Sequence, residues 1–320
     1  MRTQLADLNA FVAVANAGGF REAARATGGS ASGLSEAVRR LEAQLGVRLL
    51  NRTTRSLMPT EAGRGLLNRL GPALREVEAA IDVVNVFRER PAGTLRLNVP
   101  VSVSRLVLPA IVPGFLAAYP DIRMEVVTEE NFVDLLASGC DAGIRYEERL
   151  EQDMIAVPIG PRTQRIALAA APAYLDRRGR PDHPRDLLAH ACLKSRFPSG
   201  AMVIWAFERN GETVRIDAEG PLLVRAGEGS ELAVAAAIAG LGIVQLFEDW
   251  LQPHLASGAL ESVLEPWWPR FSGPFLYYPG RRLVPAPLRA FVDYVRHAGS
   301  IERSADASMA TAAVGRAATA

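Results

Sequence analysis

Short amphipathic helical patterns separated by glycine turns open the chain. Apolar residues recur on one helical face from Leu5 to Ala15, and Gly18-Gly19 ends that pattern. A second short helix is predicted over Phe20–Ala26, followed by the turn Thr27-Gly28-Gly29. The next apolar positions are spaced by 4, 3 and 4 residues until Gly46, at Leu34, Val38, Leu41 and Leu45, with Ser30 or Ser32 available as the N-cap. Two helices joined by a short glycine turn predict a helix-turn-helix.

The face of the third helix opposite its apolar positions is polar. At ~100° per residue it carries Ser32, Glu36, Arg39, Arg40 and Ala43, with Ser35 at its edge. Arginine side chains on such a face can reach guanine edges or phosphates in a major groove. For an isolated helix pair, a bundle with a merely solvated arginine face is the simpler interpretation.

A basic hairpin and the local charge favour nucleic acid. Arg48-Leu49-Leu50 and Ser56-Leu57-Met58 are strand-like and flank a segment with Arg52 and Arg55, which predicts a "wing" with a basic tip. Such a tip suits a phosphate backbone or a minor groove. Residues 1–70 hold ten arginines and five acidic residues, a net +5, although the whole chain has a formal net charge of +1. The wing and the charge bias together favour DNA binding.

A long helical pattern follows Thr60-Glu61-Ala62-Gly63. Its apolar positions alternate at spacings of 3 and 4, at Leu67, Leu70, Leu74, Val77, Ile81 and Val84. This spacing predicts a coiled-coil seam and a two-fold dimer, although so narrow a stripe could instead pack on its own domain. Pro72 predicts a kink, and residues 88–93 are predicted to be a linker.

Strands and helices alternate through most of the remaining chain. The first set comprises strands over 95–99, 123–127 and 142–145 and helices over 105–119 and 131–138. The second set comprises a strand over 165–170, a hairpin at Asn210-Gly211, a helix over 231–239, a strand over 243–246 and a last segment near 260–264. A strand over 275–278 and a helix over 287–297 remain, and they could return to the first lobe. Two α/β lobes with a cleft between them are therefore predicted.

Composition limits the class of protein. The chain has 320 residues, 49% of them hydrophobic, enough for two or three domains at ~150 residues each. Two cysteines and four scattered histidines show neither a disulfide framework nor a metal-ligand spacing, so no metal and no cofactor are expected. The apolar run Leu232 to Phe247 is shorter than the ~20 residues that span a bilayer. Phe11 to Ala17 ends in an Ala-x-Ala pattern that could pass for a signal peptide, but Asp7 precedes it and the apolar stretch is short and interrupted, so a helix is expected there instead. A cytoplasmic protein without membrane contact is the expectation.

The stretch 19–63 resembles the winged helix-turn-helix of the LysR-type transcriptional regulators, most closely the subgroup with the wing sequence Asn51-Arg52-Thr53-Thr54-Arg55-Ser56. The match is carried by Ala23-Ala24, Ser30, Leu34-Ser35, Arg39-Arg40-Leu41-Glu42, Leu45-Gly46, Leu49 and Thr60-Glu61-Ala62-Gly63. Ala31 departs from the polar residue usual in the family, and Thr27-Gly28 from its usual turn. Further matches include Gly139-Cys140-Asp141, Gly143-Ile144-Arg145 and Ala239-Gly240-Leu241-Gly242-Ile243.

The resemblance implies a regulator that binds double-stranded promoter DNA as a homodimer or homotetramer, with RNA polymerase as a candidate partner. The expected DNA contacts are Ser30, Ala31, Ser32, Ser35, Glu36, Arg39, Arg40, Arg52, Thr53 and Arg55. It also implies an effector domain similar to periplasmic binding proteins. Groups at strand ends and helix N-termini suit a small anion such as a carboxylate, and the candidates are Ser102, Ser104, Thr128, Phe132, Arg145, Ser195, Phe197 and Gly227. Alternatively, the serines only cap helices, Arg145 pairs with Asp141 or Glu147, and Phe197 belongs to the core.

The expected fold is a multidomain α/β protein. The predicted parts are a winged helix-turn-helix (1–59), a coiled-coil linker helix (60–90), a two-lobed effector domain (91–298, lobe 1 about 94–160 and 268–298, lobe 2 about 161–267) and a disordered tail (299–320). Catalysis is the main rival function, but no dinucleotide fingerprint, P-loop or nucleophile with its base is found. A metabolite-binding protein, or a redox sensor using Cys140 or Cys192, without specific DNA readout, is the alternative.

Overall fold

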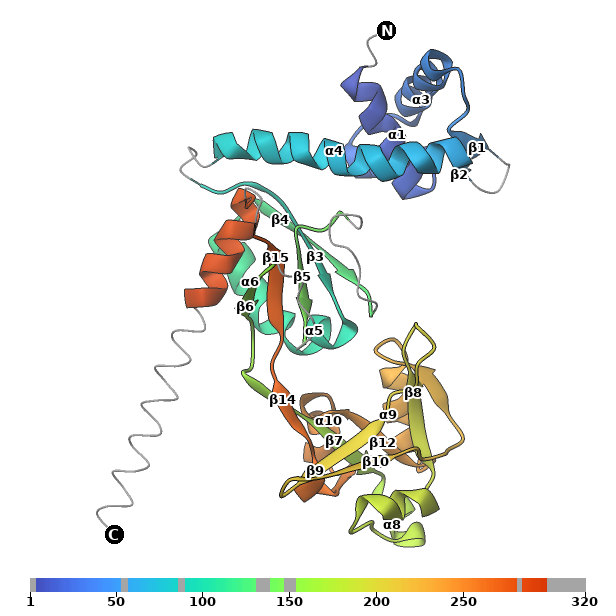
Figure 1. Cartoon of the computed structure of the whole chain (residues 1–320), viewed down its shortest axis with the longest axis vertical. Helices are drawn as coiled ribbons and strands as arrows, with labels where there is room; N and C mark the ends of the chain where they lie inside the picture. The colour runs from blue at the N-terminus through green and yellow to red at the C-terminus, as the bar shows by residue number, and fades with distance from the viewer. Residues whose placement is uncertain are drawn as a thin grey trace, which may run out of the picture. The chain divides into compact units, whose positions relative to one another are not determined.

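The chain forms two compact units, one of Met1–Arg88 with Leu136–Gly139 and one of Glu89–Leu135 with Cys140–Ala320 (Figure 1). The computed structural model describes residues 4–52, 57–85, 90–130, 139–146, 154–280 and 284–297. The predicted wing tip with Thr53 and Arg55, the predicted helix 131–138 with Phe132, and the tail 299–320 lie outside these residues.

The first unit begins with three helices, α1 (Leu5–Ala17), α2 (Phe20–Thr27) and α3 (Ala31–Leu45). Each is followed by a glycine in the left-handed region, at φ values of 65°, 69° and 69°, so glycine ends each helix as predicted. Ser30 is the N-cap of α3, and its Oγ accepts the Gly33 N–H at 3.1 Å. The core contains Phe11, Val14, Ala23, Val38 and Leu41, whereas Leu45 at the end of the apolar pattern is exposed. The helix-turn-helix prediction is confirmed.

The wing hairpin is shorter than predicted at its start. Strands β1 (Leu50–Arg52) and β2 (Leu57–Pro59) are antiparallel, with Leu50 opposite Pro59. Leu49 lies just before the ladder: Glu42 of α3 accepts its N–H, and its carbonyl accepts the Thr60 N–H. For Arg52, only the backbone is described.

Helix α4 (Glu61–Asn85) continues through Pro72. Part of the predicted coiled-coil seam packs differently from the prediction. Leu67 and Leu70, its first two positions, pack with Leu66 against the core of their own unit. Val77 is exposed, and the side chains of Ile81 and Val84 lie outside the described residues. The early seam positions therefore stabilise the helix-turn-helix unit, and only the later ones remain available for a partner helix.

In the second unit, lobe 1 has a five-stranded sheet in the order β4-β3-β5-β15-β6. Its strands are β3 (Gly93–Val99), β4 (Ile122–Thr128), β5 (Ala142–Arg145), β6 (Met154–Pro158) and β15 (Phe275–Pro279). The helix predicted over 105–119 is in fact two helices, α5 (Val101–Leu106) and α6 (Leu108–Ala118). Pro109 lacks the N–H that would bond the Arg105 carbonyl, which favours a break between them. A C-terminal helix over 286–297 contributes Phe291 to the lobe core.

Lobe 2 has a sheet in the order β11-β8-β12-β7-β13, with β14 also paired to β7. Its strands are β7 (Thr163–Ala170), β8 (Cys192–Arg196), β11 (Leu223–Arg225), β12 (Ile243–Phe247), β13 (Glu261–Val263) and β14 (Arg270–Ser272). The other elements are α8 (Pro172–Arg178), α9 (Ser230–Ile238), α10 (Glu248–Ala256), two short 3-10 helices (Pro184–Ala189 and Glu265–Trp267) and the hairpin β9 (Trp205–Arg209) to β10 (Glu212–Ile216). Asn210 and Gly211 both have positive φ, 51° and 82°, as the predicted tight turn requires.

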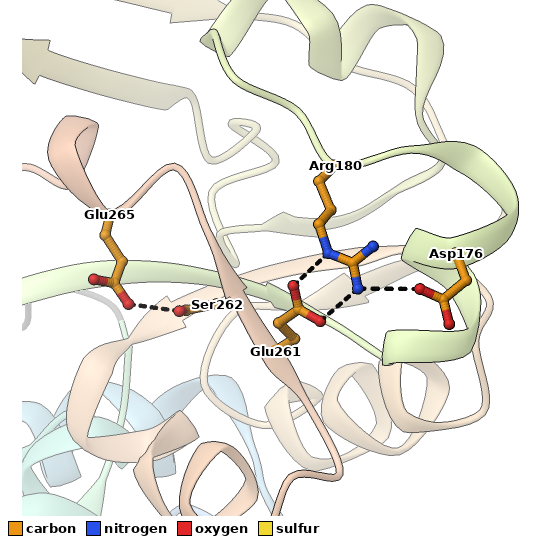
Figure 2. A network of polar contacts seen from close by, with 5 residues as sticks. All are labelled: Asp176, Arg180, Glu261, Ser262 and Glu265. Carbon is orange, nitrogen blue, oxygen red and sulfur yellow. Dashed lines mark hydrogen bonds and ion pairs between the residues drawn. The ribbon is translucent and has the colours of Figure 1, made fainter.

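A three-residue ionic cluster braces the edge of lobe 2 (Figure 2). Arg180 binds both carboxylate oxygens of Glu261 in β13, at 2.6 and 2.8 Å, and Asp176 of α8 at 3.1 Å. This cluster ties the segment after α8 to the outer strand of the sheet.

Two paired strands connect the lobes. Thr163 of β7 lies opposite Ser272 of β14, and Pro158 of β6 lies opposite Phe275 of β15. Between these pairs, the Gly273 N–H donates to the Arg162 carbonyl at 2.9 Å and the Ile159 N–H to the Pro274 carbonyl at 3.0 Å. The predicted return of the last strand to lobe 1 is therefore confirmed, and both crossings form one hydrogen-bonded ribbon.

Candidate nucleic-acid interface and effector cavity

Helix α3 presents an exposed polar face of the kind predicted for DNA contact. Ser30, Ser32, Glu36 and Arg39 are exposed, whereas Ala31 and Ser35 are half-buried. Among the described residues, Arg39 takes part in no ion pair. Glu36 lies four residues after Ser32 and Arg39 three residues after Glu36, so one face offers both a carboxylate and a cation to base edges.

Arg40 differs from its neighbour Arg39. Its Nη2 lies 2.7 Å from Oδ1 of Asp7 in α1, and the Asp7 side chain is buried. The Asp7 carboxylate raises the pKa of Arg40. The Arg40 guanidinium was predicted to contact DNA, and in the structure it has a partner within the protein.

The second unit contains a cavity of about 380 Å³ between its two lobes. Five of the eight predicted effector residues line it, namely Ser102, Arg145, Ser195, Phe197 and Gly227. Ser104 and Thr128 do not line it, because Ser104 lies on another face of α5 and the Thr128 side chain is exposed at the sheet edge. Phe132 lies outside the described residues.

Most of the lining lies at the carboxyl ends of strands. Ser102 follows β3, Glu130 follows β4, Tyr146 follows β5, and Phe247 and Trp250 lie at or after the end of β12. The sequence reasoning missed Glu130, Tyr146, Phe247 and Trp250, although the rule that found Ser102 and Arg145 applies equally to them. Phe271 is different, because it lies in the crossover strand β14 and no local pattern indicates a lining position.

Arg145 is held firmly at the cavity wall. Nη1 donates to the carbonyls of Ile144 and Asn98 at 2.8 and 3.2 Å, and Nη2 to Asn98 Oδ1 and the Glu129 carbonyl at 2.6 and 3.2 Å. The residue is 5% exposed. These bonds join the ends of β3 and β5 to the residue after β4, so Arg145 has a structural role and brings a positive charge to the cavity.

Tyr146 and two phenylalanines form an aromatic part of the cavity wall. Its ring centroid lies 5.1 Å from that of Phe247 and 5.9 Å from that of Phe271. Burial raises the pKa of Tyr146 to about 12, so the hydroxyl stays protonated. The hydroxyl faces Ser102 and Gln164 but completes no hydrogen bond of good geometry among the described residues. This hydroxyl is available to donate a hydrogen bond to an acceptor on a ligand.

Contacts between the lobes lie beside the cavity. Arg105 of α5 forms an ion pair with Glu231 of α9, and Glu231 Oε1 also accepts the Trp250 Nε1–H at 3.0 Å. Glu130 accepts the Val101 N–H at 2.9 Å, and its carboxylate lies where a Cβ on Gly227 would be. Position 227 favours glycine because its φ is 76°, and a Cβ there would also displace the Glu130 carboxylate.

Both cysteines belong to the second unit. Within the described part of the chain Cys140 and Cys192 form no disulfide, and both are buried, Cys140 beside β5 in lobe 1 and Cys192 in β8 of lobe 2. Burial raises the pKa of the Cys192 thiol to about 12, which disfavours the reactive thiolate. Within the described ranges, no group of three or more His, Cys, Asp or Glu could hold a metal ion, and no helix there is long and apolar enough to cross a membrane.

A helix-turn-helix with a wing, followed by two α/β lobes around a cavity, defines a DNA-binding transcriptional regulator with a small-molecule domain. Residues 5–64 match the profile "Bacterial regulatory helix-turn-helix protein, lysR family", and residues 88–300 match "LysR substrate binding domain". The chain belongs to the LysR family of transcriptional regulators.

Similar proteins share nearly the whole chain. A "Putative transcriptional regulator" of Pseudomonas aeruginosa is 42% identical over 93% of this chain and 96% of its own length. The "Uncharacterized HTH-type transcriptional regulator YcaN" of Escherichia coli is 40% identical over 92% and 96%. The full-length structure of the Vibrio cholerae virulence activator AphB has a TM-score of 0.63 at 26% identity, over 92% of this chain and 99% of that one. The resemblance at the level of the family and the predicted fold class are confirmed.

Proposed function

We propose that this LysR-type regulator binds promoter DNA as an oligomer and responds to a small-molecule effector in the cavity between its lobes. The observation that carries the proposal is that residues of both lobes line one cavity, so a ligand there contacts two bodies that the chain connects through the crossover ribbon. Its volume of about 380 Å³ suits a small metabolite. A ligand that touches both lobes favours one lobe arrangement over another.

The effector that fits this lining is an apolar molecule with one acceptor group, for which we propose a carboxylate. Arg145 supplies positive charge, and the Ser102 and Tyr146 hydroxyls supply donors, while the aromatic rings supply apolar surface. Ser195, Phe197 and Gly227 are the proposed contacts from lobe 2.

The proposed division of labour follows the chain. Residues 1–59 bind DNA through the exposed face of α3 and the wing, in the subgroup with the Asn51–Ser56 wing sequence. Residues 60–90 join protomers through the seam beyond Leu70, and residues 91–298 bind the effector. The family resemblance further supports assembly into a dimer or tetramer, contact with RNA polymerase, and action in the cytoplasm, where a chromosome is accessible.

Ligand-induced stabilisation of the full chain tests this function. A panel of aromatic and aliphatic carboxylates is screened by thermal unfolding, and a compound at ~100 times its Kd should stabilise the protein by ~2.7 kcal/mol. Ser102→Ala should reduce the shift, whereas Ser104→Ala, on the same helix but outside the cavity, should not. The effector proposal is refuted if no compound stabilises the chain or if both serine variants respond alike.

A further inference from the structure

The recognition helix α3 is held on two sides by charged side chains that lie close together in the sequence. Arg40 pairs with α1 although its side chain is 50% exposed, Glu42 reaches the wing, and Glu36 and Arg39 are exposed. Two arginines and two glutamates of one helix thus have different surroundings.

The contact with α1 joins residues 33 positions apart in the sequence. Asp7 is fully buried, so its carboxylate depends on Arg40, 2.7 Å away, for compensation. A buried carboxylate is unfavourable unless it is paired and hydrogen-bonded. This dependence stabilises the orientation of α3 relative to α1 in which the Arg40 guanidinium contacts the Asp7 carboxylate.

The contact with the wing uses two backbone donors. Glu42 Oε1 accepts the N–H groups of Leu49 and Leu50, at 2.8 and 3.1 Å, where the chain enters β1. Thr60, which follows β2, binds the same segment: its hydroxyl Oγ1 donates to the Arg48 carbonyl at 2.8 Å. Hydrogen bonds to a carboxylate are stronger than neutral ones, so they restrain the distance from α3 to the wing.

We infer that Arg40 and Glu42 are positioning residues, which set the recognition helix against α1 and the wing, and that Arg40 does not read DNA. The exposed Ser32, Glu36 and Arg39 then form the reading face of α3. This inference rests on the proposed DNA contacts of α3. It differs from the expectation that Arg40 belongs among them.

Positioning matters because helix and wing contact one duplex together. Base contacts require their side chains within roughly 0.5 Å of the productive geometry. A small rotation of α3 would displace every reading side chain, although no reading residue had changed. Loss of a positioning residue should therefore weaken specific binding more than non-specific binding.

The test measures binding of the full chain to a duplex carrying its own upstream region and to a scrambled duplex, over a range of salt concentrations. Asp7→Asn is the decisive variant, because it removes the buried charge and leaves Arg40 free to contact DNA. We expect Asp7→Asn and Arg40→Ala to weaken binding to the upstream duplex by about ten- to hundredfold, as a misplacement of roughly 1 Å would. The salt dependence of binding should not change. Arg39→Ala, the matched control, should leave the thermal stability unchanged and lower the preference for the upstream duplex.

Two further variants separate positioning from a charge contact. Asp7→Leu with Arg40→Met replaces the ion pair by apolar side chains, and it should restore binding to the upstream duplex. Glu42→Gln keeps an acceptor oxygen and should bind better than Glu42→Ala.

Two results would overturn the inference. One is that Asp7→Asn binds the upstream duplex as tightly as the wild type. The other is that Arg40→Ala binds both duplexes less tightly with a salt slope reduced by ~0.9, as loss of one phosphate contact predicts. Equal affinity of the wild type for both duplexes would instead refute specific readout by the protein as a whole.

Discussion

The ion pair between Arg105 and Glu231 should control how readily the lobes separate. Arg105 lies on α5 of lobe 1, and its Cζ is 4.5 Å from the centroid of the Trp250 ring of lobe 2. Glu231 bridges them by pairing with Arg105 and accepting the Trp250 indole N–H. Arg105→Gln removes both the ion pair and the cation–π contact, whereas Glu231→Gln removes only the charge and keeps an acceptor for Trp250.

The magnitude follows from the exposure of the groups. The Arg105 and Glu231 side chains are 39% and 58% exposed, so solvent screens the pair and its contribution is about 0.2–1 kcal/mol. The cation–π contact adds about 0.5–1 kcal/mol. Arg105→Gln should therefore shift the equilibrium between closed and open lobes by about 0.7–2 kcal/mol, a factor of about 3–30. Glu231→Gln should shift it by at most ~1 kcal/mol.

Distances between spin labels on the two lobes provide the assay. Exposed Arg123 and Leu188 can be replaced by cysteine for labelling, because both native cysteines are buried. Arg105→Gln should increase the long-distance population, and salt should do the same in the wild type by screening the pair. The double variant should resemble Arg105→Gln alone. Independent, additive effects of the two substitutions, or distances that do not respond to either, would refute the reasoning.

Three further predictions concern other parts of the chain. The Cys192 thiol, with a pKa raised to about 12 by burial, should resist alkylation at pH 8 until the protein unfolds, and rapid labelling of the native protein, followed by mass spectrometry, would contradict this. Arg180 lowers the pKa of Glu261 below its ordinary 4.5, so their pairing stabilises lobe 2 above that pH and is lost as the pH falls (Figure 2). Thermal unfolding of Arg180→Gln should therefore show a smaller loss of stability below pH 4.5 than the wild type, and an identical pH profile would exclude this role. Leu74→Asp should lower the oligomeric state in sedimentation while the effector unit keeps its ligand-induced stabilisation, because a charge in an apolar helix contact is unfavourable; unchanged sedimentation would place the interface elsewhere.

Local patterns in the sequence determined the elements of the DNA-binding unit and the type of its fold. The spacing of Val38 and Leu41, the glycines after the first three helices and the Ser30 cap depend on residues within one or two helical turns. Chemistry at strand ends likewise identified Ser102 and Arg145 as cavity residues, because the carboxyl ends of neighbouring parallel strands meet at one edge of a sheet. Periodicity and charge bias were sufficient because these features are local.

Tertiary structure alone decided which neighbouring residues share a role. Arg39 and Arg40 are adjacent and chemically identical, and only the packing of α1 on α3 gives Arg40 the buried Asp7 as a partner. Leu67 and Leu70 fit a coiled-coil spacing, yet they pack on their own unit because its core offers apolar surface beside α4. Phe271 reaches the cavity only because β14 pairs with β7, more than a hundred residues earlier in the chain. Such contacts depend on which surfaces pack together in the folded chain. The spacing of residues along the sequence does not determine that packing.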